Sequence, residues 1–282
     1  AILRYTLRLL TTQQRDRITK MVIAAELIRQ KTGNKYGTTP ISIGFWVGGG
    51  VTPNSFDDLK EDPEDPGKAR RNCNLLYKQL LTCPFCGKPL SSDNFYIDFE
   101  RKTVEVYCSD SNCMFYKYKQ NRMSIPVYLV DEEIYSRCPS IILSTVDKFA
   151  RLPWDVKTNA LFGRVNRLCS RDGYVAIGDD HKRHPKTADL PTSSLTPVKS
   201  FAPPELIIQD ELHLITGPLG TVYGAYETII EDLCTYTENG RTVRPKYVVS
   251  TATIKNAGEQ TKCLYGRKNT AQFPPNGFEI GD

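Results

Sequence analysis

One unit recurs along this chain and limits the folds that it can adopt: a short apolar run, then a polar cluster, then residues with helical apolar spacing. The apolar runs are β-compatible and cover residues 41–47, 141–143, 206–208 and 247–249. Strands that alternate with helices predict an α/β fold with a mostly parallel sheet and helices on both faces. Because such sheets bind ligands at the carboxyl ends of their strands, the polar clusters mark the expected functional edge.

Two adjacent carboxylates, Asp210 and Glu211, follow the apolar run 206–208. In nucleoside triphosphatases, an Asp at the end of a strand holds Mg²⁺, and a neighbouring Glu can orient or deprotonate the attacking water. The same pair could instead cap the next helix. Asp210 and His213 could also act together as metal ligands. The two carboxylates alone do not decide between these interpretations.

Four of the nine cysteines fall in two close pairs. Cys83 and Cys86 are two residues apart with Gly87 directly after them, and Cys108 and Cys113 form the second pair. Without a secretion signal, such pairs indicate metal ligands rather than disulfides. Four thiolates satisfy tetrahedral Zn²⁺, so we predict a structural zinc ribbon. A redox pair and four unrelated buried thiols are the alternatives.

A basic stretch runs from His181 to His184 within a segment rich in Pro, Ser, Thr and Lys, residues 178–204, which we expect to be a long loop. The stretch could face a phosphate, or it could form a second metal site with Cys169. The composition favours a solvated loop.

Five short segments in a fixed order carry a resemblance to superfamily 2 helicases. Asp210-Glu211-Leu212-His213 resembles motif II, and Ser250-Thr251-Ala252-Thr253 resembles motif III. Upstream, residues 5–14 resemble motif Ia, residues 48–53 resemble the next, glycine-bearing motif, and residues 142–149 match the Thr-x-x-Lys pattern before motif II. Within this superfamily the chain resembles the large helicase of the DISARM anti-phage system and its relatives.

The resemblance implies the first RecA-like lobe of an ATP-dependent DExH-box helicase or translocase that acts in anti-phage defence with ATP and Mg²⁺. It divides the chain into residues 1–66, a zinc-ribbon insertion at 67–124, and residues 125–282 with the DExH box. It makes Asp210, Glu211 and His213 catalytic. It also implies that His213 and the motif III residues Ser250, Thr251 and Thr253 couple nucleotide state to nucleic-acid grip. The implied nucleic-acid contacts, of types that commonly meet phosphates, are Arg8, Thr11, Gln13, Gly49, Thr52, Thr145 and Lys148.

The chain departs from the helicase pattern because it has no Gly-x-x-x-x-Gly-Lys-Ser/Thr loop to cradle phosphates. It also lacks an initiator Met, so we expect a piece of a longer cytoplasmic protein that is inactive by itself. Its expected partners are nucleic acid (DNA ahead of RNA), the second motor lobe of the parent and other defence-system subunits. No apolar run approaches the length of a membrane span. The net charge of +5 fits a nucleic-acid partner but decides little.

Two functions from other classes stay open. One is a zinc-ribbon nucleic-acid-binding module without catalysis. The other is a metal-dependent hydrolase or nuclease that uses Asp210, Glu211 and His213.

Overall fold

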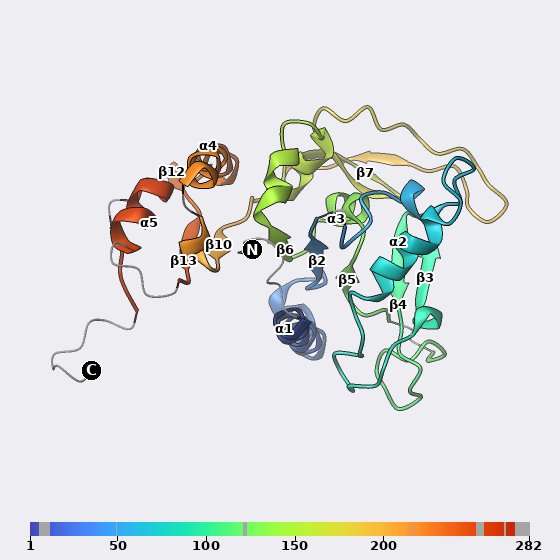
Figure 1. Ribbon diagram of the computed structural model, residues 1–282. Coiled ribbons are helices and arrows are strands. Elements are labelled where there is room, and N and C mark those ends of the chain that lie inside the picture. Colours follow the sequence, from blue (N-terminus) through green and yellow to red (C-terminus); the bar gives the residue numbers. More distant parts are fainter. Residues whose placement is uncertain are drawn as a thin grey trace.

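The computed structural model describes residues 1–5, 12–48, 50–120, 123–215, 217–251, 257–267 and 269–273. Its centre is a six-stranded sheet in the order β13-β10-β1-β6-β2-β5, and every neighbouring pair is parallel (Figure 1). The strands are β1 (Ile2–Tyr5), β2 (Ile43–Trp46), β5 (Val127–Tyr128), β6 (Ile141–Thr145), β10 (Leu206–Gln209) and β13 (Lys246–Val249). The predicted mixed α/β fold with a parallel sheet is confirmed.

Helices cover both faces of this sheet, as predicted. Successive side chains of a strand point to opposite faces, so the apolar strands present apolar side chains on both sides. On one face, Val22 and Ile23 of α1 (Thr12–Lys31) pack with Leu3 and Phe45. The opposite face is covered by α4 (Gly217–Cys234) and α3 (Asp131–Arg137), which join Ile2, Trp46, Ile142 and Ile207 in a second cluster (Figure 1). The last helix, α5 (Ala257–Tyr265), lies against α4.

The cysteine-rich insertion lies between β2 and β5, which are neighbours in the sheet. It contains η2 (Asp57–Leu59), α2 (Lys68–Tyr77), η3 (Ser92–Asn94) and the antiparallel hairpin of β3 (Phe95–Asp98) and β4 (Thr103–Val106). Leu76, Val106 and Phe115 belong to the same buried cluster as Phe45 and Val127 of the sheet. The insertion therefore shares a core with the sheet, and the predicted boundaries of the three domains remain a prediction.

A second small sheet, in the order β8-β7-β9, is antiparallel and packs near α3. Its strands are β7 (Val165–Cys169), β8 (Gly173–Ala176) and β9 (Leu195–Pro197). Residues 178–194 between β8 and β9 contain no helix or strand, which agrees with the first part of the loop predicted at 178–204. The prediction was wrong at β9, which lies inside that range and pairs with β7.

The remaining elements are short. They are η1 (Gly33–Tyr36), η4 (Val146–Arg151), η5 (Val156–Phe162), η6 (Leu212–Leu214), β11 (Tyr236–Glu238) and β12 (Arg241–Val243). In the part of the chain that the structure describes, no helix has the length and apolar character needed to cross a membrane.

Candidate functional site

The structure brings the four predicted cysteine ligands to a common centre. The Sγ atoms of Cys83, Cys86, Cys108 and Cys113 all lie within 4.8 Å of one another. Sγ of Cys83 is 3.7 Å from that of Cys113, and Sγ of Cys86 is 3.5 Å from that of Cys108. A disulfide needs about 2.05 Å. Zn–S bonds of about 2.3 Å place tetrahedral sulfurs about 3.8 Å apart. The spacing therefore fits a metal ion such as Zn²⁺.

Tight turns set the direction of each cysteine pair. The N–H of Gly87 donates to the carbonyl of Cys83 at 2.8 Å, and Gly87 has φ of 78°, which a residue with a side chain rarely adopts. At the second pair, the N–H of Cys113 donates to the carbonyl of Asp110 at 2.9 Å. The N–H of Asp110 in turn donates to Sγ of Cys108 at 3.4 Å. Because these bonds are local, the sequence around each pair is enough to aim its sulfurs inward.

Burial disfavours free thiolates at two of the four cysteines, Cys83 and Cys113. Cys83, Cys108 and Cys113 are buried, and Cys86 is exposed. Burial raises the pKa of Cys83 to about 11 and raises the pKa of Cys113 above its usual range. A divalent cation at the centre would reverse this effect, because it stabilises thiolates directly. The four sulfurs can therefore hold a metal that compensates their charge.

The acidic box lies at the carboxyl edge of the main sheet, between the ends of β1 and β13. The N–H of Asp210 donates to the carbonyl of Arg4 at 2.9 Å, and the N–H of Leu212 donates to the carbonyl of Ser250 at 3.1 Å. The predicted motif II and motif III segments are thus joined by a backbone hydrogen bond, although they are far apart in the chain.

Glu211 has a strained backbone. Its φ of 53° and ψ of 45° lie in the left-handed region, which costs a residue with a side chain roughly 1–3 kcal/mol and is enriched at functional sites. The N–H of Glu211 donates to Oδ1 of Asp210 at 2.9 Å. Oε2 of Glu211 lies 3.3 Å from Nδ1 of His213, and both side chains are about one-third exposed. The turn therefore keeps the Glu211 carboxylate accessible beside Asp210.

Two further side chains lie at the same carboxyl edge as Asp210. Burial raises the pKa of Tyr5, and the charge of Asp210 raises it further, so the two side chains share one environment. The buried hydroxyl of Thr251, two residues past the end of β13, has no hydrogen-bond partner among the described residues.

The metal-dependent hydrolase alternative gains no support from this geometry. Among the residues that the structure describes, the ligand atoms that gather closely enough to hold a metal are two groups of Cys and His side chains. Asp210, Glu211 and His213 do not form such a group.

A buried ion pair that the sequence did not reveal supports the acidic edge. Nη1 of Arg4 lies 2.7 Å from Oε2 of Glu227, and both side chains are almost fully buried. Close by, the hydroxyl of Tyr223 donates to Oε1 of Gln209 at 2.8 Å. These contacts tie α4 to β1 and β10. The one signal was an arginine inside the apolar run of β1, since a buried charge requires a partner.

Two of the predicted nucleic-acid contacts are engaged inside the protein. Thr52 is buried, and its hydroxyl donates to the carbonyl of Val47 at 3.0 Å. Lys148 is buried in an ion pair with Asp131, and its Nζ also donates to Oδ1 of Asn54 at 3.0 Å. In this conformation neither side chain presents a donor to a phosphate, which differs from the expected placement. For Lys148 the physical reason is that the buried Asp131 carboxylate needs a cation. The nucleic-acid roles of both residues stay predictions.

The other predicted contacts are placed only in part. Thr145 ends β6 at the same edge as the acidic box, and its buried hydroxyl has no partner among the described residues. Gln13 belongs to the first turn of α1. Arg8, Thr11 and Gly49, together with Thr253 of motif III, lie outside the described residues. Their roles stay predictions.

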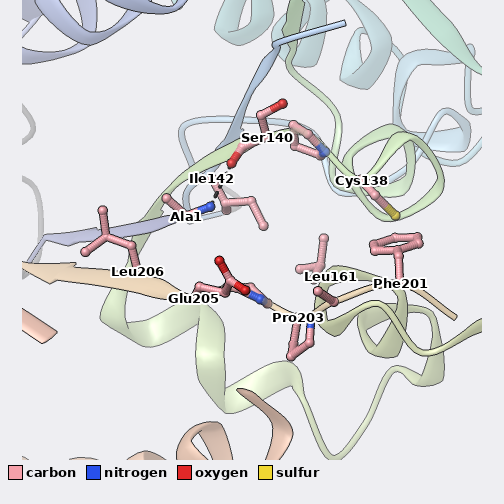
Figure 2. A pocket seen from close by; sticks show the side chains of 12 residues that line it. Ala1, Cys138, Ser140, Ile142, Leu161, Phe201, Pro203, Glu205 and Leu206 are labelled. Carbon is pink, nitrogen blue, oxygen red and sulfur yellow. Dashed lines mark hydrogen bonds between the residues drawn. The ribbon is translucent and has the colours of Figure 1, made fainter. Parts of the chain in front are cut away.

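A cavity of about 470 Å³ opens at the other end of the strands (Figure 2). Ala1, Ile142 and Leu206 line it from the amino ends of β1, β6 and β10, and Phe201 and Pro203 close its far side. None of the predicted catalytic, metal or nucleic-acid residues lines this cavity. This cavity is therefore separate from the acidic box.

Comparison with known proteins gives one informative relative. No family model matches the chain. The chain is 52% identical, over an alignment of 287 residues that covers all of it, to the DISARM protein DrmA of Bacillus paralicheniformis. It spans 25% of the length of that protein. The resemblance to a DISARM component is thereby confirmed.

Proposed function

We propose that the chain is the first motor lobe of an ATP-dependent nucleic-acid helicase or translocase in anti-phage defence. The whole of this chain aligns with one quarter of a DISARM protein DrmA. One observation carries the proposal. Each of the five segments that resemble helicase motifs follows one strand of the main sheet. Motif III follows β13, motif II follows β10, motif Ia follows β1, the Thr-x-x-Lys pattern follows β6 and the glycine-bearing motif follows β2. These five strands are consecutive in one parallel sheet. Their carboxyl ends therefore meet at a single edge.

We further propose that the sheet is RecA-like and is completed in the longer parent. β13 is an edge strand, and its outer side has no strand partner among the described residues. Val248 in its middle is 44% exposed, which is unusual for a parallel strand. A further parallel strand with a phosphate-binding loop would lie there, beside Ser250 and one strand away from Asp210.

Each residue of the acidic box would have a different role in ATP hydrolysis, which follows from its position. Asp210, at the end of β10, would hold Mg²⁺, and the bound nucleotide would supply the phosphoryl group that is transferred to water. Glu211, turned outward by its left-handed backbone, would orient the attacking water and accept its proton. His213 would couple the nucleotide state to nucleic-acid binding through its contact with Glu211. Ser250 would do so through the hydrogen bond that its carbonyl accepts from the N–H of Leu212.

The test uses the longer parent protein. We expect Glu211→Gln to reduce ATP turnover by about 10²- to 10⁴-fold while nucleotide affinity stays unchanged, because the change keeps the shape and removes the base. Asp210→Asn should reduce ATP turnover and also weaken the binding of Mg-nucleotide. Glu205→Gln is the matched control, since this exposed carboxylate precedes β10 at the opposite end of the sheet. Near-normal turnover in Glu211→Gln would overturn the proposal, and so would robust hydrolysis by the 282 residues alone.

The proposed substrate is nucleic acid, DNA ahead of RNA, and the proposed partners are the second lobe of the parent and other defence-system subunits in the cytoplasm. The binding-module alternative rests on the four-cysteine cluster. It is distinguished by measuring whether nucleotide changes nucleic-acid affinity in the parent, because a module without catalysis predicts no change.

A further inference from the structure

A second group of potential metal ligands lies where the β7–β8 hairpin meets the irregular segment 178–194. Cys169 ends β7, and His181 and His184 belong to the irregular segment. One ligand atom from each of these three residues lies within 4.8 Å of the others. Cys169 is 2% exposed, and the imidazoles of His181 and His184 are 15% and 25% exposed. The three side chains therefore converge below the surface.

Asp172, on the turn between β7 and β8, lies beside the two histidines of this group. Its Oδ2 lies 3.0 Å from Nε2 of His184 and 3.9 Å from Nδ1 of His181. Nζ of Lys102 is 4.0 Å from the same oxygen. Oδ1 of Asp172 and Nε2 of His181 are buried without a hydrogen-bond partner among the described residues. An ion pair between Asp172 and His184 explains one of these contacts, but it leaves both buried atoms unsatisfied and gives Cys169 and His181 no reason to converge.

We infer that Cys169, Asp172, His181 and His184 form a second metal site, which takes a divalent transition metal such as Zn²⁺. One thiolate, two imidazoles and one carboxylate are a four-ligand set that suits tetrahedral zinc. Bonds of about 2.0 to 2.3 Å place tetrahedral ligand atoms roughly 3.3 to 3.8 Å apart, so side-chain shifts on the order of 1 Å would bring Cys169, His181 and His184 to this spacing. Asp172, 3.0 Å from His184, would supply the fourth ligand. Four protein ligands leave no open position, which indicates a structural site.

The fold supplies a reason for such a site. Residues 178–194 have no helix or strand of their own, yet side chains hold their backbone against the hairpin. Arg167 donates to the carbonyls of Asp179 and His181, and Arg171 donates to the carbonyls of Pro185 and Pro191. A metal that joins Cys169 and Asp172 to two histidines would fix this segment at two further points. Ordering a long irregular segment has a high entropic cost, which metal binding offsets.

The site is tested by metal content in the purified 282-residue chain supplied with Zn²⁺. We expect about two equivalents of zinc per chain, and about one in Cys169→Ser and in His184→Gln. Cys234→Ser is the matched control, because Cys234 is equally buried but belongs to neither group of ligands. About one equivalent in the unchanged chain, or zinc content unaffected by both Cys169→Ser and His184→Gln, would overturn the inference.

If Cys169→Ser or His184→Gln does not fold, cobalt absorption of the unchanged chain and of His181→Gln gives a second test. In the unchanged chain loaded with Co²⁺, one of the five thiolates that contact metal would belong to the new site. We expect His181→Gln to change the cobalt absorption bands while the bands of the four-thiolate site remain. Hydrogen exchange in residues 178–194 should rise when a chelator removes the second equivalent. Identical cobalt spectra in His181→Gln and the unchanged chain would contradict the site.

Discussion

The four-cysteine cluster is held by hydrogen bonds between residues a few positions apart in the sequence. The acidic box is held by contacts between residues far apart in the sequence. The cluster is built from two tight turns beside one hairpin, and each turn closes through backbone bonds between residues a few positions apart. The acidic box is held between β1, β10 and β13, and a buried pair between Arg4 and Glu227 links residues from opposite ends of the chain. The first region is therefore set by local geometry and a metal, and the second by long-range packing.

The largest expected effect tests the local region. Cys83→Ser together with Cys86→Ser should abolish metal binding at the cluster and unfold the insertion, because structural zinc contributes on the order of 10 kcal/mol to the folding of small zinc modules. Since the insertion shares a core with the sheet, the loss should reach the whole fold. Zinc content and thermal unfolding measure it. Cys73→Ser, a half-buried thiol on α2 outside the cluster, should change neither. Unchanged thermal unfolding in the double variant would show that the cluster is not structural.

The next effect tests the long-range region. Arg4→Met leaves the Glu227 carboxylate buried without its cation, so it should lower the free energy of unfolding by about 3–5 kcal/mol. Arg4→Met with Glu227→Leu should recover most of this loss, because neither charge then remains buried. Urea denaturation of the two single variants and the double variant gives the coupling energy. Zinc uptake should stay normal throughout. A single variant that costs less than about 1 kcal/mol would contradict the role given to this pair.

The same contrast explains how much could be predicted. The turn around Cys83 and the polar residues after each apolar run are local signals, so the sequence predicted the parallel sheet, the polar groups at its carboxyl edge and the cysteine cluster. The partnership of Arg4 with Glu227 could not be predicted, because it depends on which strand and helix come into contact. Lys148 shows the same limit, since its motif predicted a phosphate and the fold supplies Asp131. The left-handed backbone of Glu211 has no sequence signal either, because the residue is not glycine.

A buried carboxyl beside the insertion gives a pH-dependent test. Glu133 of α3 is fully buried and accepts hydrogen bonds from the hydroxyl of Thr103 and, at 3.0 Å, from the N–H of Val104, so it joins α3 to the hairpin of the insertion. Burial raises its pKa from 4.5 to about 7. Between these values the folded protein holds a proton that the unfolded chain has released. Stability therefore falls as pH rises through this window.

Glu133→Gln should remove that dependence, because glutamine keeps the acceptor oxygen and does not titrate. A pKa shift corresponds to roughly 1.4 kcal/mol per unit, so the free energy of unfolding of the unchanged protein should fall by about 1–3 kcal/mol relative to Glu133→Gln between pH 4.5 and 7.5. Comparing the two proteins at each pH cancels the effect of pH on metal binding. Parallel stability profiles would show that the carboxyl is not held protonated in the folded protein.

The smallest expected effect separates two threonines at the functional edge that the helicase resemblance treats alike. The hydroxyl of Thr52 already donates to Val47, so Thr52→Val should cost about 1 kcal/mol of stability and leave nucleic-acid affinity unchanged. The hydroxyl of Thr145 has no partner among the described residues, so Thr145→Val should be neutral in stability to within about 0.5 kcal/mol. If a phosphate oxygen is the missing acceptor of Thr145, the same change should weaken nucleic-acid binding by the parent about tenfold, which corresponds to about 1.4 kcal/mol. Both variants are isosteric, so packing does not confuse the readout. Equal affinity of Thr145→Val and the unchanged parent at fixed salt would mean that this hydroxyl faces no phosphate, and the predicted nucleic-acid contact at the end of β6 would be wrong.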